Sequence, residues 1–187
     1  MEIVLRCALP DRPGALAALA GTVSECGGDI QSIEVLEHQD GRALDDLVVA
    51  IDRARVAGLV DRLTRAEDVE LIHTGPSRGD PGDAVTRLAI GLTALLDGSM
   101  DTDHAFPTLV GGLLRAGSAS LCAPDDAPRP DRRTLLVPLA ERVLVLRRDY
   151  PFTPTERQRA TTIGRAVLAA AGCGYSSVAS AAELSPG

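Results

Sequence analysis

The strongest constraint on the fold is the stretch from Leu9 to Ile30, which reads LPDRPGALAALA and closes with the residues CGGDI. It is typical of a strand that turns sharply into a helix, followed by a glycine break and a second strand. Asp11, Pro13 and Gly14 fall at the first turn of that helix, where backbone amides have no partner within the helix. Such a helix start favours an anionic group, for example the carboxylate of a ligand.

Two helices with the same apolar spacing are expected in the first part of the chain. Positions i, i+3, i+4 and i+7 are apolar in both, at Leu16, Leu19, Ala20 and Val23 and again at Val56, Leu59, Val60 and Leu63. Strand-like segments surround these helices at 3–8, 30–37, 44–51 and 69–73, and Asp40-Gly41 predicts a two-residue hairpin turn. The order βαββαβ predicts a ferredoxin-like α+β unit, with both helices on one face of an antiparallel sheet.

The motif DRPGALAALA at 11–20, followed by Gly27-Gly28-Asp29-Ile30, closely resembles the opening of the ACT domain, a small βαββαβ regulatory module. Many members of that family bind amino acids, so the resemblance implies a ligand site shared by adjoining subunits of a homodimer. On this resemblance the lining residues are Asp11, Gly14, Ala15, Leu16, Asp29 and Ile30. The amides of the helix start would hold the ligand carboxylate, and Asp11 or Asp29 would receive its ammonium group.

Two simpler interpretations stay open for this segment. Asp11 alone could hydrogen-bond the free amides of the helix start, and many ACT domains serve assembly without a known ligand. We also expect that a side chain at position 14 would crowd a ligand near the backbone and barely affect folding. Asp29 stands where the family often has Asn, in a chain that contains no Asn.

Composition excludes several classes of function. All nineteen basic residues are Arg, so a lysine Schiff base, a pyridoxal phosphate anchor and a Walker A loop are excluded. The net charge of −7 and the lack of a basic run make the chain a poor nucleic-acid binder. Four scattered cysteines without a Cys-x-x-Cys pair argue against a metal site and a disulfide framework. We expect a cytoplasmic protein without a membrane anchor and without a cofactor.

A second domain is expected after the linker-like segment rich in Gly, Pro and Asp. The division predicted is an ACT domain at 1–74, a linker at 75–83, a second domain at 84–172 and a disordered tail at 173–187. Helical patterns cover about 85–96 and 106–114, and strands are expected near 117–123, 134–139 and 142–148. Thr153-Pro-Thr-Glu156 predicts a capping box that opens a last helix. Residues 134–171 are similar to the closing hairpin and last helix of GAF domains, which implies a reduced, small α/β GAF-like domain.

No arrangement of residues typical of an active site appears in the sequence. The three histidines, at 38, 73 and 104, are interpreted as solvated or locally bonded, and no nucleophile elbow is present. The pairs Arg132-Arg133 and Arg147-Arg148 are interpreted as solvated strand ends, with a basic ligand pocket as a remote alternative. We therefore expect no catalysis. The chain is predicted to be a regulatory protein that binds an amino acid and signals by assembly. An unidentified protein partner could receive the signal. The alternative is a ligand-free dimerisation module.

Overall fold

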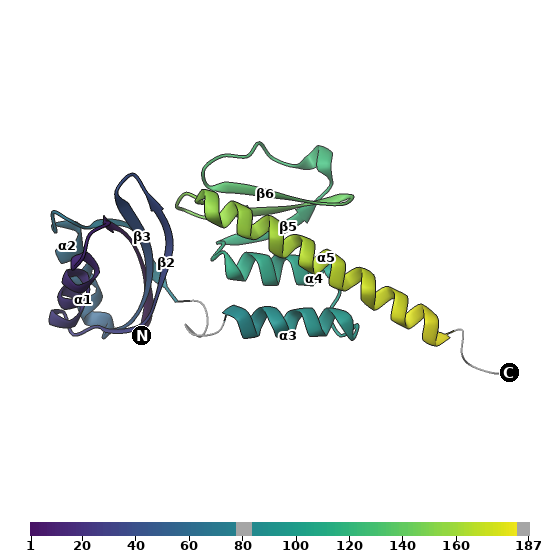
Figure 1. Ribbon diagram of the computed structural model, residues 1–187, viewed down its shortest axis with the longest axis horizontal. Coiled ribbons are helices and arrows are strands. Elements are labelled where there is room, and N and C mark those ends of the chain that lie inside the picture. The colour runs from purple at the N-terminus through teal and green to yellow at the C-terminus, as the bar shows by residue number, and fades with distance from the viewer. Residues whose placement is uncertain (78–83, 183–187) are drawn as a thin grey trace. The chain divides into compact units, whose positions relative to one another are not determined.

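The computed structural model describes residues 1–77 and 84–182, and for residues 84 and 173–182 it describes the backbone alone. The chain divides into two compact units, Met1–Gly82 and Asp83–Gly187 (Figure 1). Among the helices of the described residues, none is both long enough and apolar enough to cross a membrane.

The first unit is a four-stranded antiparallel sheet with two helices. In chain order it consists of β1 (Glu2–Pro10), α1 (Ala15–Glu25), β2 (Asp29–Gln39), β3 (Arg42–Ala50), the 3-10 turn η1 (Arg53–Arg55), α2 (Val56–Thr64) and β4 (Glu70–Pro76). The strand order is β2-β3-β1-β4, and every neighbouring pair is antiparallel. The predicted ferredoxin-like α+β arrangement is confirmed, and residues 44–50 are strand as expected.

Period-2 alternation in the two central strands explains where the helices pack. Every second residue of β1 and β3 faces one core, together with the apolar stripes of both helices: Ile3, Leu5, Cys7, Leu9, Leu19, Val23, Leu47, Val49, Ile51, Leu59 and Leu63. Both helices lie on this one face of the sheet (Figure 1). The predicted placement of the helices is therefore also confirmed.

Glycines fix the two sharp reversals that the sequence predicted. Asp40 and Gly41 both have positive φ, 53° and 73°, and Gln39 pairs with Arg42 across them, as a two-residue primed turn requires. The break after α1 is a Schellman motif. There the Gly28 N–H donates to the Val23 carbonyl at 2.9 Å, and Gly27 adopts φ 78°.

The second unit combines a three-stranded antiparallel sheet with helices. Its elements are α3 (Ala84–Leu96), α4 (Thr102–Ala105), the π-helix η2 (Phe106–Gly111), β5 (Ser118–Cys122), the 3-10 turn η3 (Pro124–Asp126), β6 (Thr134–Leu139), β7 (Arg142–Arg147) and α5 (Pro154–Ala182). The sheet order is β5-β7-β6. All three predicted strands and the hairpin between the last two are present.

The capping box that the sequence predicted opens α5. The Thr153 N–H donates to Oε2 of Glu156 at 2.9 Å, and the Glu156 N–H donates to Oγ1 of Thr153 at 3.1 Å. This reciprocal pair satisfies two donors that a helix start otherwise leaves unpaired. The hairpin and helix start that the GAF resemblance implied are thus observed, while membership of that family stays a prediction.

One predicted helix has a different form. Residues 106–114 were expected to form a regular helix, but Phe106–Gly111 is a π-helix that continues α4. Pro107 supplies the physical reason, because proline lacks the N–H of an i→i−4 bond and its ring clashes with the carbonyl one turn earlier. The wider turn still buries Phe106, Leu109 and Val110 in the core of this unit.

The ends of several elements differ from the sequence-based ranges. β4 continues to Pro76, two residues past the predicted end of the first domain, and residues 78–83 of the predicted linker lie outside the described residues. α5 is helical to Ala182, although residues from 173 were expected to be a tail without regular structure. Residues 183–187 of that tail are also outside the described part.

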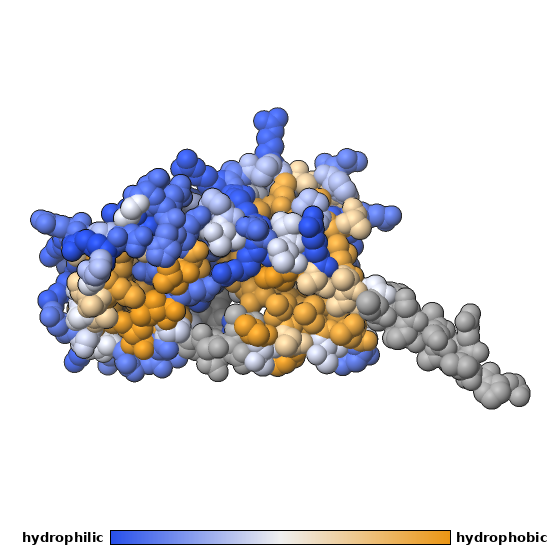
Figure 2. Space-filling view, in the orientation of Figure 1, coloured by the Kyte–Doolittle hydropathy of each residue, from blue (hydrophilic) through white to orange (hydrophobic). Residues whose placement is uncertain are grey.

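The surface of α3 is partly apolar (Figure 2), with Val85, Ile90 and Leu96 exposed.

Candidate functional site

The helix α1 begins without a side-chain cap. Gly14 occupies the N-cap position, and no side chain bonds to the first turn. The Ala18 N–H donates to the Gly14 carbonyl at 2.9 Å, and the Ala15 N–H donates to the Arg12 carbonyl at 3.3 Å. Within the described residues, the N–H groups of Leu16 and Ala17 have no acceptor. Two unpaired donors at the positive end of a helix can hold a carboxylate.

Gly14 has a backbone conformation that residues with a side chain rarely adopt. Its φ of 89° is left-handed, and a Cβ built there would meet no atom within 4 Å. Space is therefore available, but a side chain would be strained in this conformation. The expectation that a side chain at position 14 would barely affect folding is wrong for this reason.

Asp11 lies beside the hairpin between β2 and β3, and it does not cap α1. Its backbone N–H donates to the Gly41 carbonyl at 2.8 Å, and Oδ2 lies 3.1 Å from Nδ1 of His38. The Asp11 side chain is 50 % exposed, so a ligand could reach it. The simpler interpretation, in which Asp11 bonds to the free amides of the helix, is wrong. His38 is locally bonded, as predicted.

Asp29 lies at the opposite end of the same sheet. It starts β2 and pairs with Ala50, which pairs in turn with Glu2 at the start of β1. Asp11 instead follows Pro10, at the other end of β1. A strand of this length separates the two carboxylates by roughly 25–30 Å, at about 3.3 Å per residue. In one chain the structure therefore groups Asp11, Gly14, Ala15 and Leu16, and it does not bring Asp29 to them.

Within one chain, Asp29 and Ile30 have few neighbouring groups that could bind a ligand together with them. Asp29 is exposed and accepts a hydrogen bond from Nε2 of Gln31 at 2.7 Å. Ile30 is partly buried against the helix-side core. Only a second copy of the chain could place these residues against the start of α1.

Asp45, in β3, is a buried acidic residue within electrostatic range of Asp11 and His38 that the sequence analysis missed. Its side chain is buried, with 2 % exposed, and Oδ1 has no hydrogen-bond partner among the described residues. In the strand register it lies opposite Cys7 and Val35. Burial raises the pKa of the Asp45 carboxyl; His38 opposes this rise, and Asp46 and Asp11 add to it. Burial, with Asp45 and Asp46 nearby, also raises the pKa of the Cys7 thiol to about 12, so this thiol is inert.

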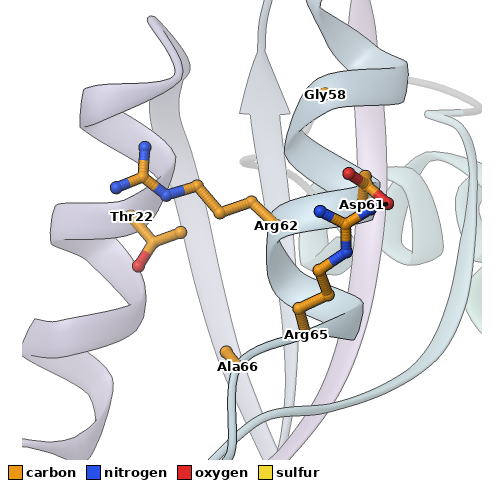
Figure 3. A pocket seen from close by; sticks show the side chains of 6 residues that line it. All are labelled: Thr22, Gly58, Asp61, Arg62, Arg65 and Ala66. Atoms are coloured by element: carbon orange, nitrogen blue, oxygen red, sulfur yellow. Dashed lines mark hydrogen bonds and ion pairs between the residues drawn. The ribbon is translucent and has the colours of Figure 1, made fainter.

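A separate open depression lies between α1 and α2. It has a volume of about 520 Å³ and is lined by Thr22, Gly58, Asp61, Arg62, Arg65 and Ala66 (Figure 3). Its two arginines already have partners, since Arg65 bonds Asp61 at 2.8 Å and Arg62 bonds Glu25. None of the predicted ligand-binding residues lines this depression, and its cations are already neutralised.

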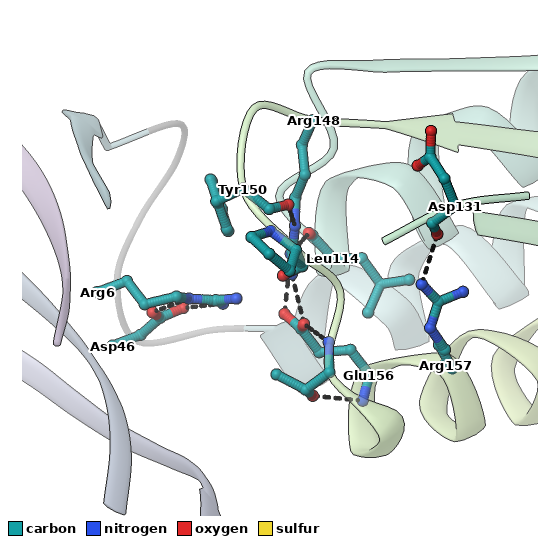
Figure 4. Close-up of polar contacts among 10 residues, drawn as sticks. Arg6, Asp46, Leu114, Asp131, Arg148, Tyr150, Glu156 and Arg157 are labelled. Carbon is teal, nitrogen blue, oxygen red and sulfur yellow. Dashed lines mark hydrogen bonds and ion pairs between the residues drawn. The ribbon is translucent and has the colours of Figure 1, made fainter. Parts of the chain in front are cut away.

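Arg148 forms an extensive set of hydrogen bonds in the second unit (Figure 4). Its Nε–H donates to the Tyr150 carbonyl at 3.2 Å. One terminal nitrogen donates to the Leu114 carbonyl and to Oε1 of Glu156, at 2.8 and 2.9 Å. The other donates to the Pro151 carbonyl and to Oε2 of Glu156, at 2.7 and 2.5 Å. All five N–H groups of the guanidinium are therefore used.

The interpretation of Arg148 as a solvated strand end is wrong. The residue is 6 % exposed, and the rings of Tyr150 and Phe152 lie against its guanidinium, with centroids 4.1 and 3.9 Å from Cζ. Its neighbour Arg147 and the pair Arg132-Arg133 are exposed, as predicted. With no donor left, Arg148 cannot serve a basic ligand pocket.

The described residues contain no cluster of three or more His, Cys, Asp or Glu that could hold a metal ion. Cys7, Cys26 and Cys122 are free thiols. His104 is exposed and bonds Asp101, which caps α4 by accepting a hydrogen bond from the His104 N–H at 2.8 Å. The hydrogen bonds from His104 lower the pKa of the Asp101 carboxyl.

Comparison with known proteins bears on the first unit. The family model described as "ACT domain" matches residues 3–68, which include both helices and three of the strands. Residues 3–68 are an ACT domain. The resemblance read from the helix-opening motif is thereby confirmed, and the match does not extend to the GAF-like segment. No curated protein matches the chain.

Solved structures similar to the whole chain include regulatory proteins and one enzyme. A candidate glycine cleavage system transcriptional repressor is 10 % identical, with a TM-score of 0.37 over 90 % of this chain and 92 % of that one. The regulatory subunit of aspartate kinase from Thermus flavus is 16 % identical, with a TM-score of 0.35 over 90 % and 92 %. Formyltetrahydrofolate deformylase from Burkholderia mallei is 13 % identical, with a TM-score of 0.31 over 90 % and 94 %. TM-scores this low do not support an inference about function from these structures. The family assignment rests on the match to residues 3–68.

Proposed function

We propose that this chain is a non-catalytic regulatory protein whose ACT domain binds an amino acid between two copies of the chain. The observation that carries the proposal is the uncapped start of α1. There the free N–H groups of Leu16 and Ala17 lie in the same turn region as the accessible carboxylate of Asp11. A zwitterion complements this pairing, because its carboxylate can accept from the amides and its ammonium can donate to a carboxylate.

The position of Asp29 supports a site made by two copies. β2 is an edge strand of the sheet, and it exposes two large apolar residues, Ile33 and Val35. An open edge with apolar side chains invites pairing with another chain. If two β2 strands paired antiparallel about a twofold axis, Asp29 of each copy would lie beside the Gln39 end of the other. That end carries His38, and with it Asp11.

The same exposed edge also fits the second candidate function, a dimerisation module without a ligand. Ile33 and Val35 favour pairing whether or not an amino acid binds. The two functions differ only at the start of α1, where a ligand-free module leaves the amides to water. For the cell compartment, the free thiols of Cys7, Cys26 and Cys122 agree with a reducing, cytoplasmic setting.

Titration calorimetry with each of the twenty standard amino acids tests the proposal. We expect one or a few to bind with a Kd below about 1 mM, which corresponds to roughly −4 kcal/mol. Asp11→Asn and Asp29→Ala should each weaken that binding at least tenfold. Asp40→Asn is the matched control, because Asp40 is an exposed turn residue with φ 53°, a conformation that Asn tolerates. If no amino acid binds while the chain is dimeric, the dimerisation module is the correct function.

A further inference from the structure

Asp45 combines burial with an incomplete set of partners. Only 2 % of the residue is exposed, yet Oδ1 has no donor among the described residues. A buried carboxylate oxygen without a partner is costly, since burial removes its hydration and no hydrogen bond from the described residues replaces it. The neighbouring Asp46 differs in this respect. It lies on the other face of the sheet, and its two oxygens accept from Nε and a terminal nitrogen of Arg6 at 2.7 and 2.8 Å.

The strand register places Asp45 on the face of the sheet that carries α1. Asp45 pairs with Cys7, whose side chain is part of the helix-side core. Ala43, two residues earlier on the same face, pairs with His38 of β2. The His38 ring in turn contacts Asp11 at 3.1 Å. Asp45 is thus a diagonal neighbour of His38, and it lies on the side of the sheet from which the chain enters α1.

Groups close to Asp45 in the strand register or through their charges are accessible to solvent. The side chains of His38 and Asp11 are 60 % and 50 % exposed, and Val35 is 49 % exposed. The charged or titratable groups whose fields reach Asp45 are His38, Asp46 and Asp11. Of these only His38 can be positive, and only when protonated. A cationic group that moved the imidazole aside would meet two carboxylates, one of which has an unused oxygen.

We propose that Asp45 is a ligand-binding residue of this site and that its carboxylate receives the ammonium group of the bound amino acid. The inference rests on the proposed function and refines it, because it assigns the ammonium to a residue of β3. The carboxylate and the ammonium group of the ligand would then bind two sets of groups that have no partner among the described residues: the amides of Leu16 and Ala17, and Oδ1 of Asp45. In this arrangement Asp11 orients His38 and forms the rim.

The test compares an amino acid with its analogue that lacks the ammonium group. Calorimetry first identifies which of the twenty standard amino acids binds. That amino acid and its desamino acid, for example leucine and 4-methylpentanoate, are then titrated into the full-length wild type, Asp45→Asn and Asp40→Asn. We expect the wild type and Asp40→Asn to prefer the amino acid at least tenfold over the desamino acid. Asp45→Asn should lose this preference and bind both at the level of the desamino acid.

Each outcome bears on the proposal. If Asp45→Asn retains the preference, the assignment of the ammonium to Asp45 is overturned while the amino-acid site stands. If the wild type binds no amino acid, both the site and the assignment fall. Folding of Asp45→Asn is checked by circular dichroism and melting; Asp45→Thr, a second neutral residue suited to a strand, should show the same loss of preference.

Discussion

Asp45 and Glu156 are both buried carboxylates, 2 % and 3 % exposed, but their surroundings are opposite. Glu156 accepts from Arg148 through both oxygens and from the Thr153 N–H. Asp45 has an oxygen that nothing in the described chain bonds. The Glu156 carboxylate should therefore stabilise the fold together with its partners. The Asp45 carboxylate should lower stability whenever it is ionised.

Replacing Asp45 with Asn should stabilise the protein at neutral pH. Burial raises the pKa of Asp45 above its ordinary value of 3.8, so the folded state binds a proton more strongly than the unfolded chain. The free energy of unfolding of the wild type therefore falls as pH rises through the folded pKa. Asp45→Asn should melt at a higher temperature than wild type at pH 7, and the difference should vanish below pH 3.8. Asp40→Asn should match wild type throughout, and an Asp45→Asn protein that melts lower at pH 7 would contradict the account.

Truncating Arg148 should have one of the largest effects on stability in the chain. Arg148→Met leaves the carboxylate of Glu156 buried without its cation, which costs about 3–5 kcal/mol of unfolding free energy. Urea denaturation measures the loss, and the exposed neighbour substituted as Arg147→Met serves as control, with an expected change of at most about 0.5 kcal/mol. The double variant Arg148→Met/Glu156→Leu should be more stable than Arg148→Met. Equal losses for Arg147→Met and Arg148→Met would show that the buried pair does not stabilise this unit.

At the scale of elements, two glycines near the same helix should respond oppositely to alanine. A Cβ at Gly28 would lie 2.8 Å from Cγ1 of Val23 and 2.9 Å from Cγ1 of Val49, whereas a Cβ at Gly21 would meet nothing within 4 Å. Gly28→Ala should destabilise by about 1–3 kcal/mol through overpacking. Gly21→Ala, inside α1, should stabilise by about 0.5–1 kcal/mol. Thermal unfolding of the two variants tests the pair, and a shift of the same sign in both would be inconsistent with this packing.

Local rules account for the elements that could be predicted from the sequence. The apolar stripes of α1 and α2, the turn at Asp40-Gly41 and the capping box at Thr153 each depend on residues close together in the chain. Features that depend on tertiary packing could not be predicted in this way. The burial of Arg148 requires Leu114 and Glu156 to meet it from two other segments.

The burial of Asp45 in β3 could have been predicted from the sequence. Asp45 and Asp46 are adjacent in a segment with strand pattern, and adjacent strand residues point to opposite faces. One of the two therefore had to face the core beneath the helices. The motif at 11–16 correctly located the uncapped helix start, but sequence spacing could not show that Asp29 lies at the far end of the sheet.

At the scale of the whole molecule, the proposed ligand site depends on a second copy of the chain. One ACT domain holds Asp11 and Asp29 at opposite ends of its sheet, so a shared ligand site is possible only if two copies meet. Light scattering at tens of micromolar should therefore report a dimer.

A mixture of two defective variants tests whether two copies of the chain build one ligand site. Asp11→Asn and Asp29→Ala chains are combined in equal amounts, allowed to exchange subunits, and titrated by calorimetry with the amino acid that the wild type binds. Each variant alone should bind at least tenfold more weakly than wild type. In a mixed dimer one site has both carboxylates and the other has neither, so random pairing should restore wild-type affinity at roughly a quarter of the sites. A mixture that binds as weakly as either variant alone would contradict a site built from Asp11 of one copy and Asp29 of the other.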